Sequence, residues 1–129
     1  MTNSIVLGVA AAAALAASSA HAAGALGGDP AKGAVIFKQQ CGLCHSVDPG
    51  VENAAPNLRG VVGRKAAGDA RFGTYTPAIK GSKVVWTAAS LDSFLGGPAK
   101  MIPGTAMPIT LADPKQRHDV IAYLASVKK

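Results

Sequence analysis

The chain has 129 residues, with 13 lysines and arginines against seven acidic residues, and only two cysteines. This length suits a single domain once any targeting segment is removed. The net charge of +6 suggests anionic partners. No run of basic residues is longer than the terminal Lys128-Lys129, so a nucleic-acid partner is not expected. Because aromatic residues make up only 5% of the chain, a core built from side chains alone would be thin.

Residues 1–22 are predicted to form a secretion signal peptide. Ile5 to Ala17 is an unbroken apolar run rich in alanine, and Ser18-Ser19-Ala20-His21-Ala22 provides a small-x-small cleavage site. The alternative is an uncleaved membrane anchor, but the run is shorter than the ~18–20 residues that a membrane span needs. We therefore expect residues 1–22 to be removed after export and residues 23–129 to form one domain.

Helices joined by long loops are predicted for the rest of the chain. Asp29-Pro30 combines an N-cap with a proline at the first helical position, and the helix is expected to run into Cys41. Residues 46–75 lack periodicity and are interpreted as an irregular wrap. Further helices are expected at 77–81, after Thr87, over 98–102 and after Asp113-Pro114. One face of the last helix carries Arg117, Val120, Ile121, Leu124 and Val127. The prediction is an all-α fold, and loops this long need something to order them.

Cys41-Gly42-Leu43-Cys44-His45 is the attachment signature of a c-type haem. The two thiols add to the vinyl groups of the porphyrin, and the adjoining imidazole supplies one axial nitrogen to the iron. A thioredoxin-like dithiol would need a preceding strand, whereas here an amphipathic helix precedes the motif. A structural zinc site would need four ligands, and no second cysteine pair exists. The sequence therefore predicts one haem c attached through Cys41 and Cys44, with His45 on the iron.

The other axial position of the iron is assigned to Met107. This methionine lies in a loop bounded by proline and glycine, which is a poor place to bury a flexible apolar side chain but rigid enough to hold a thioether. Met101 is better explained as core filling, and His118 lies off the apolar stripe of its helix. A thioether ligand stabilises ferrous iron and leaves no open position for a substrate, which describes an electron carrier.

At this point the sequence resembles the class I cytochromes c, in particular the branch that contains mitochondrial cytochrome c and its bacterial periplasmic relatives. The resemblance covers essentially all of the mature chain. It rests on the order and spacing of the haem motif together with the segments 33–37, 55–58, 63–65, 102–107 and 119–124. It implies the cytochrome c fold, with a few helices and long loops wrapped around one covalently bound haem.

The resemblance also implies roles for individual residues. The carbonyl of Pro56 would accept a hydrogen bond from His45 and make the imidazole a stronger donor to iron. Arg64 would lie near a haem propionate. Tyr75 and Trp86 would enclose the propionates and hydrogen-bond to them, although both could instead be ordinary core aromatics.

The function implied is that of a soluble, monomeric, periplasmic one-electron carrier and not an enzyme. Its partners would be redox proteins that it docks to transiently: a quinol-oxidising membrane complex, a terminal oxidase or a periplasmic dehydrogenase. The alternative is a haem peroxidase or gas-binding protein, in which Met107 would be absent from the iron. A third possibility is a redox module that remains tethered to the membrane.

Some positions depart from the family pattern. Phe94 replaces a tyrosine whose hydroxyl usually contacts the methionine sulfur, and Ile109 replaces an aromatic residue at the haem edge. Gln40, Ala99 and Ala106 occupy positions where the mitochondrial branch carries lysines. We therefore expect partner docking to be less electrostatic and more apolar here than in that branch.

Overall fold

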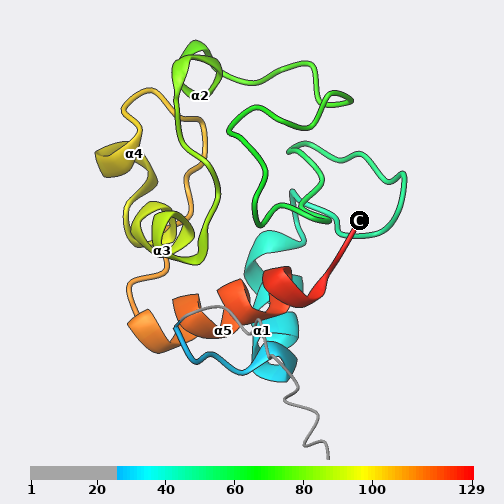
Figure 1. Ribbon diagram of the computed structural model, residues 1–129, viewed down its shortest axis with the longest axis vertical. Coiled ribbons are helices and arrows are strands. Elements are labelled where there is room, and N and C mark those ends of the chain that lie inside the picture. The colour runs from blue at the N-terminus through cyan, green and yellow to red at the C-terminus, as the bar shows by residue number, and fades with distance from the viewer. Residues whose placement is uncertain (1–25) are drawn as a thin grey trace, which may run out of the picture.

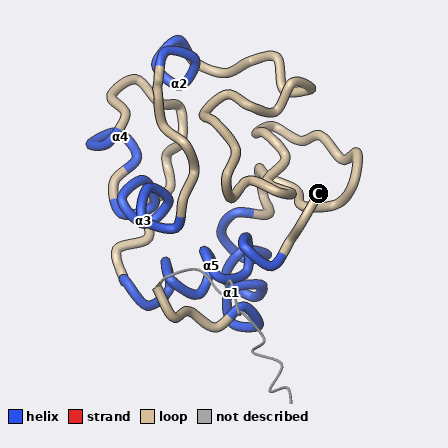
Figure 2. Tube along the Cα trace, viewed as in Figure 1, coloured by secondary structure: helices blue, strands red, loops and turns tan. Residues whose placement is uncertain are grey.

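The structure is a computed structural model that describes residues 26–129, so the predicted signal peptide lies outside the described residues. The elements are α1 (Pro30–Ile36), η1 (Phe37–Cys41), α2 (Pro77–Gly81), α3 (Ala88–Gly96), α4 (Pro98–Met101) and α5 (Pro114–Ser126), shown in Figure 1. Residues 26–129 contain no strand, only an isolated bridge between Lys65 and Val85. The all-α class is confirmed, and Figure 2 shows how much of the path is loop.

The helices begin where the sequence predicts because side-chain caps fix their first turns. The Asp29 carboxylate accepts the backbone N–H of Ala31 at 2.9 Å, and the Asp113 carboxylate accepts that of Lys115 at 2.8 Å. Thr76 caps α2 in the same way, and Thr87 forms a reciprocal capping box with Ser90 at the start of α3. Each cap satisfies a backbone donor that would otherwise have no partner.

The end of the first helix differs from the uniform α-helix that the sequence suggests. Its last turn, η1, is a π-helix, in which the Gly42 N–H donates to the Phe37 carbonyl at 2.7 Å. A π-turn takes more residues per turn than an α-turn and is common at functional sites. Phe37 and Cys41, at the two ends of this turn, are both buried, and Cys41 is the first residue of the predicted haem motif.

The helices α1 and α5 cross in close contact at one end of the molecule (Figure 1). The crossing requires a glycine, since a Cβ added to Gly33 would lie 1.9 Å from the carbonyl oxygen of Asp119. Beside it, the rings of Phe37 and Tyr123 pack with centroids 5.4 Å apart. The buried Asp119 carboxylate accepts the Asp29 N–H at 2.8 Å and so fastens the start of α1 to α5.

The core side chains surround a central cavity and do not fill it. They come mainly from η1, α3 and α5, with Val61, Trp86, Ile102 and Leu111 from the connecting segments. The most buried wall of this helical frame is α5, where Val120 and Ile121 are almost fully covered.

Over residues 26–129, no helix has both the length and the apolar character needed to cross a membrane.

The close crossing predicts that Gly33→Ala destabilises the folded haem protein. The added methyl group would meet backbone atoms of α5, which cannot move aside as a flexible side chain could, so we expect a loss of about 3 kcal/mol in the free energy of unfolding. The matched control is Gly81→Ala in α2, where an added Cβ meets nothing within 4 Å. Denaturant unfolding of both variants checks this, and equal effects would contradict the packing argument.

Asp119 makes the stability of this crossing depend on pH. The Asp29 N–H and the Lys115 ammonium hold the pKa of Asp119 below its usual 3.8. A carboxyl group with a lowered pKa stabilises the fold above its usual pKa, and that contribution disappears as the pH falls through the lowered value. We expect wild type to exceed Asp119→Asn in unfolding free energy at pH 7, with the gap shrinking towards pH 3. A gap that stays constant between these pH values would show that ionisation of Asp119 plays no part.

Candidate functional site

A cavity of about 330 Å³ lies at the centre of the frame and brings the sequence-predicted site residues together. All eight of them line it: Cys41, Cys44, His45, Pro56, Arg64, Tyr75, Trp86 and Met107. The remaining lining side chains are mostly apolar and come from η1, the loop between η1 and α2, α2, α3, the segment after α4, and α5. Arg64 is the one lining residue with a permanent charge, so the interior favours a large apolar ligand with few polar groups.

The two cysteines lie at the end of η1, in a tight turn. The Cys41 carbonyl accepts the N–H groups of Cys44 at 3.1 Å and His45 at 2.9 Å. Cys41 is buried and Cys44 is exposed, and both thiols are free. Burial raises the pKa of the Cys41 thiol to about 11. The turn therefore presents two thiols and an imidazole to one cavity, one thiol deep in its wall and the other at its opening.

The His45 ring is oriented by the loop that follows it. Its Nδ1 donates a hydrogen bond of 2.7 Å to the Pro56 carbonyl, which can only accept. Burial lowers the pKa of His45, an effect that outweighs the opposing influence of the Pro56 hydrogen bond and is reinforced by the Arg64 charge. The imidazole is thus held neutral, with the proton on Nδ1 and the lone pair of Nε2 available to a metal.

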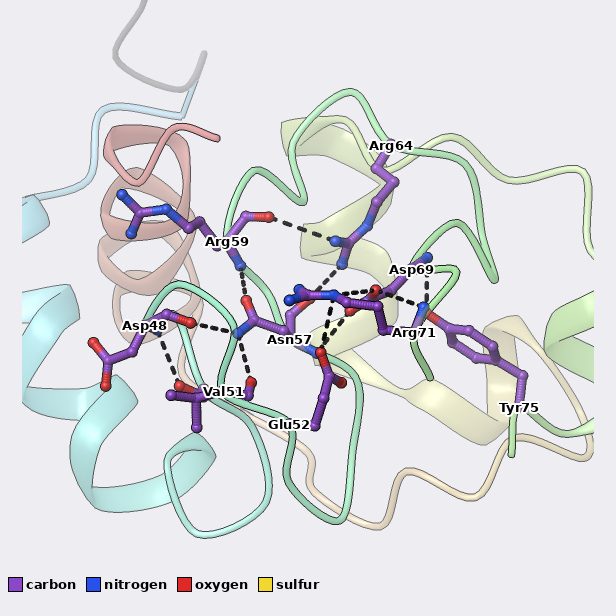
Figure 3. Close-up of polar contacts among 10 residues, drawn as sticks. Asp48, Val51, Glu52, Asn57, Arg59, Arg64, Asp69, Arg71 and Tyr75 are labelled. Atoms are coloured by element: carbon purple, nitrogen blue, oxygen red, sulfur yellow. Dashed lines mark hydrogen bonds and ion pairs between the residues drawn. The ribbon is translucent and has the colours of Figure 1, made fainter. Parts of the chain in front are cut away.

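Asn57, next to Pro56, is the centre of a polar network that orders the long loop (Figure 3). Its side-chain amide donates to the carbonyls of Asp48 and Val51, each at 2.8 Å, and its Oδ1 accepts the Arg59 N–H at 2.8 Å. Its own backbone N–H donates to the buried Asp69 carboxylate at 3.2 Å. Asn57 is 1% exposed, so these bonds hold the peptide that carries the Pro56 carbonyl in a single position.

The sequence reasoning gave no role to Asn57 or Asp69. Asn57 stands within a segment that the family resemblance singled out, and a polar amide between apolar neighbours in a long loop is the one signal that points to it. Asp69 offers no comparable signal. Its importance comes from tertiary contacts, since it accepts from the Asn57 N–H and forms an ion pair with Arg71 at 3.5 Å.

The polar side of the cavity is formed by Arg64 and Tyr75. The Arg64 guanidinium donates to the Asn57 carbonyl at 2.7 Å, and the Tyr75 hydroxyl accepts the Asp69 N–H at 3.2 Å. Burial raises the pKa of Tyr75, so its hydroxyl keeps a proton to donate. Trp86 packs against Phe94 with ring centroids 4.9 Å apart and forms part of the apolar wall.

Met107 lines the cavity, whereas the two other ligand candidates do not. Met101 packs against the core outside the cavity, and His118 is partly exposed and lies 3.5 Å from the Asp92 carboxylate. In Figure 1 the loop after α4, which carries Met107, lies on the left, and the loop after η1, which carries His45, lies on the right. The methionine and the histidine therefore reach the cavity from separate parts of the frame.

The donor set fits a haem better than a bare metal ion. Across residues 26–129, no group of three or more His, Cys, Asp or Glu side chains could hold a metal ion between them. Instead the cavity offers one imidazole, one thioether, two thiols and a broad apolar lining. An imidazole and a thioether can complete the coordination of an iron that already has four porphyrin nitrogens, and the lining suits the porphyrin itself.

Comparisons with known proteins agree with this interpretation. The cytochrome c family model matches residues 30–128. Cytochrome c of Tetrahymena pyriformis is 46% identical over 101 residues, covering 78% of this chain and 90% of the relative. Cytochrome c2 of Rhodomicrobium vannielii is 42% identical over 111 residues, covering 84% of each chain. The structure of cytochrome cH from Methylobacterium extorquens superposes with a TM-score of 0.69 at 39% identity, covering 75% of this chain and 97% of the other.

These matches confirm the family and the fold that the sequence resemblance implies. They extend over mitochondrial-type and bacterial proteins and over almost all of the described residues. Members of the family carry electrons and generally catalyse no reaction of their own. The chain belongs to the cytochrome c family, and its cofactor is a covalently attached c-type haem.

Proposed function

We propose that this chain is an exported one-electron carrier whose haem iron is ligated by His45 and Met107. The observation that carries the proposal is that both side chains line the same apolar cavity as the two thiols of the attachment motif. When bound, the haem would supply a one-electron ferric/ferrous couple. If His45 and Met107 both bound the iron, they would leave no coordination position for a substrate, which favours a carrier over a peroxidase or a gas-binding protein.

Different residues around the cavity would hold different parts of the haem. Cys41 and Cys44 would each form a thioether bond by adding sulfur to one carbon of a vinyl group and the thiol proton to the other. Pro56 orients His45 through the 2.7 Å hydrogen bond. Arg64, Tyr75 and Trp86 would surround the propionates, with one cation and one hydroxyl donor turned to the polar side. The apolar lining keeps water away, so little solvent has to rearrange when the charge of the site changes.

We further propose export to the periplasm with cleavage of residues 1–22, and transient docking of a monomer to redox partners there. The apolar run and small-x-small site of the N-terminal segment support export, as does the likeness to bacterial cytochrome c2. The candidate partners are a quinol-oxidising complex, a terminal oxidase or a periplasmic dehydrogenase.

The opening of the cavity is uncharged, which supports docking that is mainly apolar. The exposed residues of its lining are Gln40, Cys44, Ala54, Thr74, Ala106, Pro108 and Ile109. None of these side chains is a lysine, an arginine or a carboxylate, although the chain as a whole carries a charge of +6. A partner that docks here would meet a neutral surface, while the positive charges act from farther away.

Substitution of Met107 tests the ligand assignment. The ferric protein should show the weak absorption band at the red end of the visible spectrum that methionine ligation produces. Met107→Ala should lose this band and lower the reduction potential by on the order of 0.1–0.3 V, because ferrous iron loses its soft ligand. Met101→Leu is the control and should retain both the band and the potential. A wild-type protein that lacks the band and binds carbon monoxide rapidly when reduced would contradict the carrier proposal.

Small charged oxidants test the neutral opening. The rate of oxidation of the ferrous protein by hexacyanoferrate(III) should fall by less than about tenfold between 0.01 and 0.5 M ionic strength, whereas a docking face that acted with the full +6 charge would change it by orders of magnitude. Ala106→Lys adds a charge at the opening and should raise the low-salt rate and steepen its salt dependence. A steep fall with salt in the wild type would overturn the apolar-docking proposal.

A further inference from the structure

The segment that follows Met107 is held to the rest of the fold at Leu111, a few residues further along the chain. Pro108, Ile109 and Thr110 are exposed, but Leu111 is 2% exposed and lines the cavity. The Leu111 N–H donates to the Leu95 carbonyl on α3 at 2.8 Å. The position of Met107 therefore depends on what holds Leu111, because the residues between them have little packing of their own.

Arg117 on α5 is the main polar contact of that fastened point. Its Nη1 donates to the carbonyls of Leu111 and Ala112, each at 2.9 Å. Its guanidinium also lies over the end of α3, since a Cβ added to Gly96 would be 3.6 Å from the Arg117 Cζ. The positive charge thus sits beside the carbonyls at the C-terminus of that helix, where a cation is favoured.

Asp92 on α3 fixes Arg117 in this position. The Arg117 Nε donates to the Asp92 Oδ1 at 2.7 Å, and the two side chains are only 14% and 29% exposed. Partial burial makes this ion pair stronger than a surface pair and limits the other positions open to the guanidinium. One planar donor group therefore links α3, α5 and the segment after Met107, which a lysine ammonium could not do with the same geometry.

We propose that Arg117 and Asp92 are positioning residues that keep Met107 in place on the haem iron. The proposal rests on the ligation by Met107 proposed above. Without the Arg117 guanidinium, the Leu111 and Ala112 carbonyls lose their charged donor. The segment from Pro108 to Ala112 can then move away from the cavity together with Met107. The alternative is that the ion pair merely joins α3 to α5 and stabilises the whole fold.

Displacement of Met107 by added imidazole separates these two roles. Imidazole binds ferric iron only after Met107 has left. The apparent affinity for imidazole therefore depends on how readily Met107 and the segment that follows it, here called the methionine segment, move away from the iron. Arg117→Met should raise the imidazole affinity of the haem protein at least about tenfold. The substitution removes hydrogen bonds from a charged donor, and these bonds stabilise only the closed state, in which Met107 is bound. Arg117→Lys should give an intermediate increase, because it keeps the charge but not the fork. Asp92→Asn should also raise the affinity.

The matched control is Lys115→Met on the same helix. It removes the ion pair of Lys115 with Asp119, at 3.1 Å; the hydrogen bonds of the Lys115 ammonium run to Asp119 and not to residues 108–112 of the methionine segment. Its imidazole affinity should equal that of wild type even if its unfolding free energy falls. If Arg117→Met does not fold, Arg117→Lys and Asp92→Asn decide the question.

Two results would overturn the proposal in distinguishable ways. A wild-type protein that has the methionine band, with Arg117 and Asp92 variants that bind imidazole no more tightly than Lys115→Met, leaves the ligation intact and rejects the positioning role. A wild-type protein without the band rejects the ligation by Met107 and, with it, everything that Arg117 would position.

Discussion

The close crossing of α1 and α5 is the contact on which the rest of the structure depends. It is possible because Gly33 lets the two backbones meet, and it fixes the direction in which η1 leaves α1 towards Cys41 and His45. The same α5 carries Arg117, which holds the segment after Met107. The positions of both proposed iron ligands thus depend on contacts with α5, although the two residues stand 62 positions apart in the chain. A shift at the crossing would alter the space between them.

The long loop after η1 shows how a chain without regular structure can still be rigid. In a helix or a sheet the backbone groups satisfy one another, but here a buried side chain does part of that work. The amide of Asn57 binds two carbonyls and one N–H, and every buried side-chain nitrogen and oxygen in the described part of the protein has a partner. Because Pro56 directly precedes Asn57, the rigidity passes to the carbonyl that orients His45.

Most of what the sequence predicts about the fold comes from interactions between neighbouring residues. The Asp-Pro pairs at 29–30 and 113–114 mark true helix starts because capping involves only neighbouring residues. The π-turn at η1, the network around Asn57 and the position of Asp69 were missed because they depend on partners that sequence periodicity does not reveal. Arg117 shares a face of the last helix with Val120 and Ile121 as expected, and its side chain is only 14% exposed, but its partner Asp92 is 25 residues away, so no spacing rule could connect them.

The two sides of the proposed iron site, His45 and Met107, are held by different means. His45 is oriented by a short hydrogen bond to the Pro56 carbonyl, which lies next to the buried, fully hydrogen-bonded Asn57. Met107 is followed by three exposed residues, and its anchor is an ion pair that is itself partly exposed. Phe94, on the cavity wall, has no hydroxyl to offer the thioether. Local opening costs least where contacts are few and exposed, so the methionine side is the weaker of the two. If Met107 ligates the iron as proposed, control of ligation, and through it of the potential, would lie with the residues that fasten the segment after Met107.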